Sequence, residues 1–505
     1  MIVVSHNVFD PPDGTPRLVA KVGNALHITT QPSVIRRLLL IEAGSPLDSA
    51  RLVESERALR ELGVFRSVRF DTLRVGDKLA LRVETADGWS TSPQLNFSSS
   101  AGSTTWSASM VERNFLGLAT LVSASYGVTP DRHSLDLQFA SPGLVFRHAP
   151  LVAAYSHLSD GDAGVWGYGL PFYRTDARWS LVTTGEAASQ RVLDFRHPAS
   201  GLVVDSALRR ALVFQLSGGL ALHATSRSYL RLWAGAAWRR EDYVADTTPR
   251  LPVPYSGFGT VGVGIDAARV RYGVFQHLNG FAQQEDVDLS SAVSLGLWAA
   301  PRAWGYGSDH AGVGPVLSGQ VATRWSSGLA LLRAEAHGVF GRAGLDSGQT
   351  HASLDLASLA LSRQAILLHL EGGAMHGQRP GTAYDLWATL NGPRGFGAHV
   401  FTGTRYLYAM LEDRLVVADH LWGVVGVGVA PYIEYGGAWY GGNVPTPLGG
   451  PESARLGGDV GLALRVGSPR SVRGDVGEFA LSYRYRRFSG DGPWALTVRK
   501  SFALK

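Results

Sequence analysis

Only one segment of the chain has the spacing of a nucleotide-binding site. Residues 257–262 read GFGTVG and match the GxGxxG pattern of dinucleotide-binding turns. Such a turn must open a helix and be followed by an acidic residue about 20 positions later. Here a strand-like alternation continues instead, and Asp266 comes far too early. We therefore expect a glycine-rich strand at this position, and no bound cofactor.

Metal-dependent and nucleophilic catalysis are not indicated either. The 15 histidines form no HExxH or other paired ligand spacing, so we expect no metal site. Cysteine is absent, which excludes disulfides, thiolate metal sites and thiol nucleophiles. No GxSxG segment supports a serine nucleophile. We expect a protein that is not an enzyme, and a net charge of +5 without a Lys/Arg run predicts no nucleic-acid partner.

Two charged residues in unusual surroundings suggest a different role. Arg394 lies in the glycine-rich segment 392–397, GPRGFG, and Glu434 interrupts the apolar strand pattern of residues 432–437. An arginine fork can hold a carboxylate through two parallel hydrogen bonds. The residues alone leave two interpretations open. Arg394 and Glu434 either tie a loop across the lumen of a barrel, or are a solvated loop arginine and a separate lumen acid.

The segments that would position this pair have the pattern of membrane strands. Only 18% of the residues are charged, and glycine occurs 61 times. In residues 230–238, Leu230 and Leu232 alternate with Arg231. Arginine opposite an apolar outer face is inverted for a soluble core and is what a transmembrane barrel requires. About 410 residues, at roughly 20–30 per strand and connection, predict about sixteen strands.

A soluble all-β protein is the alternative interpretation of the same strands. The chain has no fixed repeat of about 40–50 residues, which weakens a propeller. No uncharged apolar run comes near the roughly 18 residues that a membrane-spanning helix needs. A membrane β-barrel is therefore the fold that we favour.

The first 90 residues have a different pattern, with the only convincing helices. We expect a strand near residues 25–28, a helix beginning at Pro32, and a second helix capped by Asp48. Two strands follow at residues 64–73 and 78–85. This β-α-α-β-β order predicts a small α+β module over residues 21–88, with residues 1–20 unassigned. The start has no basic segment and no apolar core, so we expect that an export leader is missing.

Taken together, these motifs resemble the BamA/TamA family of outer-membrane assembly proteins and the related two-partner secretion transporters. The N-terminal module is similar to a POTRA domain. Residues 112–117, ERNFLG, resemble the family's E-x-N-x-x-G connection, and residues 394–396 match the RGF core of its loop motif. Glu434 stands where the family carries an acid that holds the loop arginine. A departure is that only one POTRA module fits into 90 residues.

The resemblance implies a mainly β protein, with one periplasmic POTRA domain over residues 21–88 and a sixteen-stranded outer-membrane barrel over residues 93–505. A loop would fold into the lumen and be locked there. The first and last strands would meet at a weak seam. The residues implied for the lock are Arg394, Gly395, Phe396 and Glu434, and those implied for the seam are Leu95, Phe97, Trp494, Leu496, Val498 and Phe502.

The implied function is insertion or translocation of proteins across a bacterial outer membrane. An unfolded or exported client strand would pair with the opened seam by strand addition. The implied partners are outer-membrane lipid, the client, and periplasmic proteins at the POTRA domain. Two alternatives remain: a passive outer-membrane channel and, with less support, a soluble β-rich enzyme.

Overall fold

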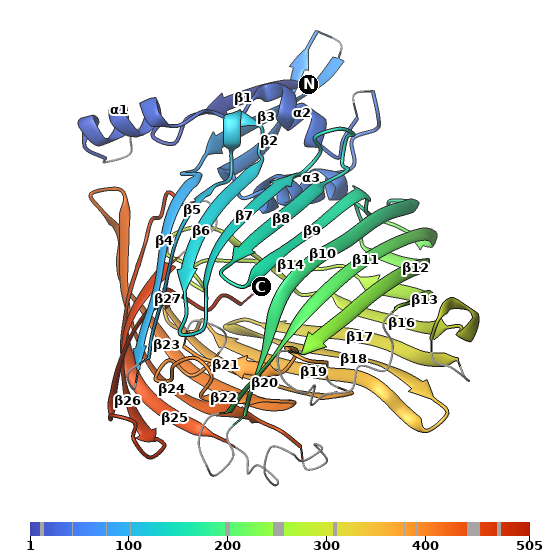
Figure 1. Cartoon of the computed structure of the whole chain (residues 1–505). Helices are drawn as coiled ribbons and strands as arrows, with labels where there is room; N and C mark the ends of the chain where they lie inside the picture. The colour runs from blue at the N-terminus through green and yellow to red at the C-terminus, as the bar shows by residue number, and fades with distance from the viewer. Residues whose placement is uncertain are drawn as a thin grey trace.

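The computed structural model describes residues 1–10, 15–42, 44–76, 78–100, 103–196, 203–245, 257–306, 311–377, 379–388, 392–441, 455–471 and 476–504. Most of them form a closed antiparallel barrel of 20 strands (Figure 1). A small α/β module covers one end of the barrel, which we call the module end. No helix in the described ranges is both long enough and apolar enough to cross a membrane.

The barrel wall follows the order of the chain, and among the described residues two short strand pairs and the sheet of the module stand outside it. Its strands are β4 Thr91–Ser100, β5 Ser103–Glu112, β6 Leu121–Val128, β7 His133–Ser141, β8 Leu151–Leu158, β9 Gly161–Leu170, β10 Trp179–Arg196, β11 Val203–Ala224, β12 Ser228–Ala245, β13 Gly257–Arg269, β16 Ser291–Ala300, β17 Gly312–Trp325, β18 Gly328–Gly341, β19 Gly344–Ser358, β20 Gln364–His376, β23 Arg405–Leu421, β24 Val425–Trp439, β25 Gly457–Gly467, β26 Val476–Arg486 and β27 Trp494–Lys500.

The expected count of sixteen strands is wrong. The estimate assumed roughly 20–30 residues for each strand and its connection. Six strands, β4 to β9, fit within residues 91–170, because each is at most ten residues long and the connections between them have at most nine residues. The barrel is therefore wider than the sequence arithmetic predicted.

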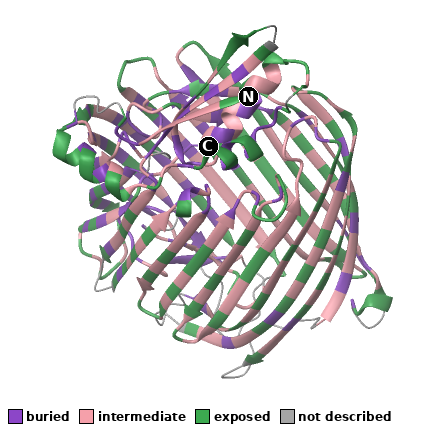
Figure 2. Ribbon diagram, turned by 90° about the horizontal axis from the view of Figure 1, so that it is seen from above, coloured by how far each residue is buried: buried purple, intermediate pink, exposed green. Residues whose placement is uncertain are grey.

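The wall has its apolar side chains outside and its polar side chains inside. On β26, Phe479 and Leu481 are 48% and 51% exposed, whereas Ser482 and Arg484 are 0% and 2% exposed. The same alternation runs along most strands (Figure 2). The glycine-rich residues 257–262 lie in β13, within this wall. The inverted pattern read from the sequence is present in the fold.

The module contains a three-stranded sheet in the order β1-β3-β2, with β1 parallel to β3 and β2 antiparallel to it. Its elements are β1 Ile2–His6, α1 Arg17–Leu26, α2 Pro32–Leu38, α3 Ser49–Glu61, β2 Phe65–Val75 and β3 Lys78–Asp87. No POTRA domain is evident in the described residues, so this part of the expected fold is wrong. Residues 25 and 26 end a helix rather than begin a strand, and the first strand lies in the segment that had been left unassigned.

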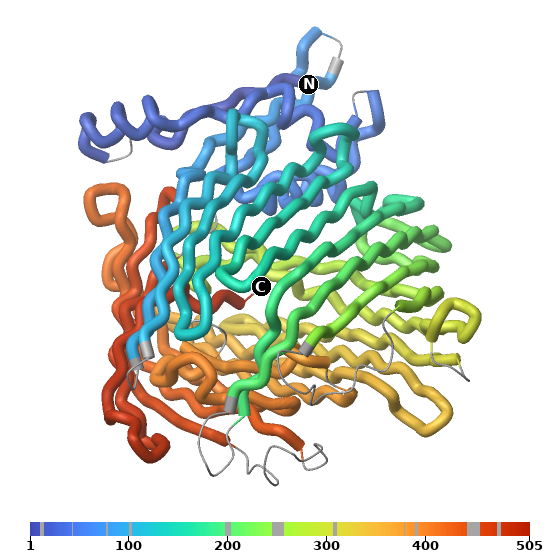
Figure 3. Tube along the Cα trace, in the orientation of Figure 1, coloured from blue at the N-terminus to red at the C-terminus, as the bar shows by residue number. Residues whose placement is uncertain are grey.

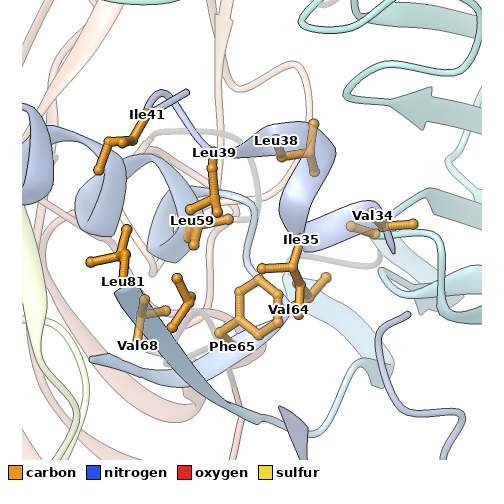
Figure 4. Close-up of a cluster of buried hydrophobic side chains, with 12 residues drawn as sticks. Val34, Ile35, Leu38, Leu39, Ile41, Leu59, Val64, Phe65, Val68 and Leu81 are labelled. Carbon is orange, nitrogen blue, oxygen red and sulfur yellow. The ribbon is translucent and has the colours of Figure 1, made fainter. Parts of the chain in front are cut away.

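Local chemistry explains the second and third helices. Pro32 is the first residue of α2, where its missing N–H costs no hydrogen bond. The Asp48 carboxylate accepts a hydrogen bond of 2.9 Å from the Ala50 N–H and caps α3. Both helices pack on the sheet through a buried apolar cluster (Figure 4). The cluster includes Val34, Ile35, Leu38, Leu39, Leu59, Val64, Phe65, Val68 and Leu81.

Three further pieces of chain are associated with the lumen. A hairpin of β14 (Tyr272–Phe275) and β15 (Glu285–Asp288) connects β13 and β16 at the module end. We call residues 271–289 the inner hairpin. A small pair, β21 (Tyr384–Leu386) with β22 (Phe401–Gly403), belongs to the long connection between β20 and β23. After β27 the C-terminal tail leaves the wall and ends within the barrel (Figure 3).

Candidate functional site: the lumen lock and the seam

The connection between β20 and β23 places Arg394 in the lumen. Among its described residues, Phe396 and Phe401 are 1% and 0% exposed and pack against Leu386. The backbone passes so close to β25 that a Cβ on Gly395 would lie 3.0 Å from the Cβ of Asp459. The Gly395 N–H donates to the Asp459 carboxylate at 3.1 Å. Gly395 therefore lets the connection, which we call the inner loop, approach the wall.

The Arg394 side chain is fully buried among carboxylates. Its guanidinium donates a hydrogen bond to Glu412 and lies 3.6 Å from Glu434 and 3.5 Å from Glu478. Its Cζ atom lies 3.9 Å from the centre of the Tyr432 ring, a cation–π arrangement. A charge removed from water in this way is stabilised only by such partners.

The two residues that the sequence suggested as a pair are in contact, in an unexpected way. The shortest contact of Glu434 with Arg394 is to its backbone N–H, at 2.6 Å, and not to its guanidinium. The other Glu434 oxygen accepts a hydrogen bond from the Tyr408 hydroxyl at 2.7 Å. Glu412 is the carboxylate that accepts a hydrogen bond from the guanidinium. The role of these residues as a lock remains a prediction.

The arginine and its partners belong to a larger buried cluster, which we call the lumen lock. It contains four arginines and four acids: Arg394, Arg414, Arg465, Arg499, Glu412, Glu434, Asp459 and Glu478. Arg499 lies 3.3 Å from Glu478 and 3.7 Å from Glu434. Opposite charges thus face one another in the cluster, as a dry site requires.

Sequence reasoning missed most of this cluster, although its signal is present in the strands. Glu412 and Arg414 are two positions apart, as are Tyr432 and Glu434, so each pair points to one face of its strand. Polar residues repeated at that spacing between exposed apolar ones mark the lumen face. The spacing does not show which strands contact the inner loop.

The lumen lock also contacts β27, the last strand of the wall. The Thr497 hydroxyl donates to the Arg394 carbonyl at 2.8 Å, and an Arg499 N–H donates to the Ala388 carbonyl at 3.1 Å. Because both donors lie on β27, the inner loop holds this strand from the lumen side.

On the side of β27 that faces β4, the backbone pairing is short. Within the described residues, β27 is in register with β4 only over Leu496–Val498, opposite Ser99, Ser98 and Phe97. Phe97, Leu496 and Val498 therefore lie at the junction of β27 and β4, and its role as a seam stays a prediction. Leu95 is on β4 but outside the register, and Trp494 is in register with β26.

Phe502 is not at the seam. The chain leaves the wall after Lys500, and the Phe502 ring lies 4.7 Å from the His369 ring. The Phe502 carbonyl accepts a hydrogen bond of 2.7 Å from Arg414 of the lumen lock. The final aromatic thus belongs to the packing inside the barrel.

The inner hairpin joins the lumen lock to the module, and nothing in the sequence predicted it. Arg414 donates to the Leu278 carbonyl at 2.8 Å, and Arg465 donates to the Asn279 carbonyl at 2.6 Å. At the far side of the hairpin, Asp286 accepts a hydrogen bond of 2.7 Å from Arg60 of α3. A continuous series of polar contacts therefore runs from the inner loop to the module.

The motif at residues 112–117 also ties the module to the barrel. The buried Asn114 amide donates to the Ile28 carbonyl at 2.9 Å and to the Thr30 hydroxyl at 2.9 Å. Its oxygen accepts a hydrogen bond from the Ala119 N–H at 3.0 Å. An asparagine suits this position because its amide nitrogen can donate hydrogen bonds while its oxygen accepts one.

At the end of the barrel away from the module, His399 attaches the inner loop to the turn between β6 and β7. Its ring contacts Asp131 of that turn and lies 2.7 Å from Asp385 of β21. Burial alone would lower the pKa of His399, but the two carboxylates outweigh it and raise the pKa to about 9. The imidazolium is therefore the stable form near neutral pH.

The described residues contain no group of three or more His, Cys, Asp or Glu side chains placed to hold a metal ion. The acids of the lumen lock contact arginines and hydroxyls, among them Ser501, whose hydroxyl donates a hydrogen bond to Glu478 at 2.6 Å. These contacts can hold separate parts of the chain together.

Comparison with known proteins finds only distant structural likeness. No family model and no curated protein matches the chain. CdiB from Escherichia coli is 13% identical, with 99% of this chain and 76% of that one covered and a TM-score of 0.47. BamA from Haemophilus ducreyi lacking POTRA domains 1–3 is 13% identical, with coverages of 99% and 85% and a TM-score of 0.37. The alcaligin outer membrane receptor FauA from Bordetella pertussis is 12% identical, with coverages of 84% and 78% and a TM-score of 0.34. These likenesses are too distant to assign a family.

Proposed function

We propose that this chain is an outer-membrane barrel that inserts or translocates client proteins by opening the seam between β27 and β4. The exposed apolar residues outside and buried charges inside support a membrane location. Apart from the short β27–β4 junction, the closed barrel leaves no strand edge in the hydrocarbon, which makes such a location possible.

The observation that carries the proposal is the short β27–β4 register. Three residue pairs join these strands, whereas all of Trp179–Arg196 is in register with β11. A strand edge that is free over part of its length can accept an extended segment through backbone hydrogen bonds. The module-end half of β4 has such an edge on the side toward β27.

The contents of the lumen favour a gated device over a passive channel. The inner loop, inner hairpin and C-terminal tail all contribute buried residues to its interior: Arg394, Phe396, Leu278 and Leu504 are each at most 3% exposed. An open pore would require these segments to move. The inner loop is instead tied to the seam strand β27, and the C-terminal tail continues from that strand, so a change at the lumen lock would reach the seam.

The test uses paired cysteines, which the cysteine-free chain makes unambiguous. The double variant Ser99→Cys/Leu496→Cys joins register partners across the seam, and Ala187→Cys/Leu212→Cys joins partners across β10–β11 as the matched control. Each is placed in liposomes, and the folding rate of an unfolded eight-stranded outer-membrane barrel protein is measured.

We expect the chain to accelerate folding of this probe, oxidation of the seam pair to abolish the acceleration, and reduction to restore it. Oxidation of the control pair should have no effect. Acceleration that survives the seam disulfide would contradict the proposal. Absence of acceleration together with a large steady conductance would favour the passive channel.

A further inference from the structure

The helix α1 has an apolar face that the rest of the protein leaves uncovered. Leu18 and Leu26 are each 74% exposed, and Val19 and Val22 are 42% and 49% exposed. With 3.6 residues per turn, these four side chains and Ala25 fall within an arc of about 120°. A soluble module would normally bury a stripe of this kind.

The opposite face of α1 accounts for its packing on the module. Ala20 and Gly23 are buried there, and a Cβ on Gly23 would lie 2.4 Å from the Phe9 ring. The Asn24 side chain accepts a hydrogen bond from the Phe9 N–H at 3.0 Å. The helix is therefore held on one side, and its apolar arc is free on the other.

A single arginine fixes the start of α1 at the rim of the barrel. Arg470 donates to the Val8 carbonyl at 3.1 Å, to the Thr15 hydroxyl at 3.3 Å and to the Gly423 carbonyl at 3.2 Å. Gly423 belongs to the turn between β23 and β24 and has a φ of 73°, and a Cβ there would lie 2.6 Å from Thr15. Close packing at this glycine seats the segment before α1 on the turn.

The outside of the barrel is apolar up to this turn. Val417 and Leu421 of β23 are 62% and 39% exposed, and Trp422 at the tip is 72% exposed. Exposed tryptophan at the end of a membrane strand is typical of the membrane–water interface. Figures 1 and 2 both show α1 at the periphery of the barrel at the module end, and Figure 1 shows it running across the strand direction.

We propose that α1 is an interfacial helix that lies in the periplasmic leaflet of the outer membrane and anchors the module to it. The occupant of the apolar arc is phospholipid. Continuity with the apolar belt at Trp422 argues for lipid, and Lys21, which borders the arc on one side, suits the phosphates of anionic headgroups. An apolar face with a basic residue at its border is typical of helices that lie in the plane of a membrane.

The proposal rests on the membrane location proposed above but not on client handling. The experiment separates the two. Single cysteines are placed at Leu18, Val22 or Leu26 and labelled with an environment-sensitive fluorophore. The full chain is inserted, one copy per disc, into nanodiscs of phosphatidylethanolamine and phosphatidylglycerol, with or without lipids that carry a quenching spin label.

Two positions serve as controls. Leu462→Cys places the label on the outer face of β25, where the side chain is 55% exposed. Val75→Cys places it near the tip of the β2–β3 hairpin, where the side chain is 57% exposed and the hairpin points away from the barrel (Figure 1).

We expect a blue-shifted emission at the α1 positions and spin-label quenching several-fold stronger than at Val75, close to that at Leu462. Quenching at Leu462 with none at α1 would overturn this proposal and leave the membrane location intact. No quenching at Leu462 would overturn the membrane location itself. A blue shift at α1 without quenching would mean that protein, not lipid, covers the arc, and would also overturn the proposal.

Discussion

The junctions β10–β11 and β27–β4 belong to the same barrel wall and differ sharply in how they are held. The first is in register along all eighteen residues of β10, and backbone pairing alone can maintain it. The second is in register over three residues, and its strand β27 is held instead from the lumen through Thr497 and Arg499. The comparison shows that the backbone ladder holds the first junction along the whole of β10, whereas at the second junction the ladder between described residues is short and two side chains tie β27 to the inner loop.

The largest effect is expected from breaking the lumen lock. Glu412→Gln leaves Arg394 and Arg414 without the carboxylate that they share, and loss of one partner in a buried ion cluster costs about 3–5 kcal/mol. The temperature at which the folded form stops resisting SDS should fall strongly. Glu335→Gln is the control, because that side chain is 60% exposed and should change the temperature little. Equal behaviour of the two variants would contradict the lock.

A smaller effect is expected from cross-linking the seam. The oxidised pair Ser99→Cys/Leu496→Cys encloses almost the whole barrel, and a disulfide of that kind contributes about 2–4 kcal/mol. It should slow unfolding in SDS more than the oxidised Ala187→Cys/Leu212→Cys pair, because the seam separates first. If both oxidised pairs slowed unfolding in SDS equally, the two junctions would not differ in strength, and the comparison would be contradicted.

Breaking the contact between the module and the inner hairpin is expected to have a still smaller effect on stability. Asp286→Asn removes the charged partner of Arg60 in a half-buried site, and hydrogen bonds to charged groups are worth about 1.5–3 kcal/mol. Protease cleavage within the module should become faster, while the SDS resistance of the barrel is retained. Glu61→Gln is the control, because the Glu61 side chain on the same helix is 53% exposed and its replacement should leave cleavage little changed.

The smallest expected effect is the pH dependence of stability that comes from the contacts of His399 with Asp131 and Asp385. The folded pKa of about 9 lies above the ordinary value of 6.5, so protonated His399 stabilises the fold below pH 6.5. This contribution is lost as the pH rises through about 9. The SDS-resistance temperature should therefore fall slightly between pH 7 and pH 10, and the part of the fall due to this residue should be absent in His399→Gln. An unchanged fall in the variant would assign it to other groups.

The features of the fold that could be predicted from the sequence are those that depend on the local pattern of residues. Alternation of residues such as Leu481 and Ser482 depends on which face of a strand points out of the barrel, so a barrel with an apolar outer face could be predicted. Asp48 and Pro32 mark helix starts by local hydrogen bonding. The predicted number of strands was wrong because the alternation does not determine how long the turns between strands are.

The candidate site could be predicted only in part. Arg394 and Glu434 stood out because each is a charge in unsuitable surroundings, and they do lie together. Glu412 and Arg414 appear as ordinary lumen residues until a loop is placed above them. The inner hairpin escaped prediction because its contacts, such as Arg60 with Asp286, join positions 226 residues apart.

Hydrogen exchange of the full chain in nanodiscs tests the central claim most directly. Amide protection is measured for peptides covering β4 and β27 and for peptides covering β10 and β11, because local opening sets the exchange rate. The account predicts that the seam-facing amides of β4 and β27 exchange orders of magnitude faster than those of β10 and β11, and faster still in Glu412→Gln. Equal protection at both junctions, unaffected by that substitution, would contradict a weak seam controlled from the lumen.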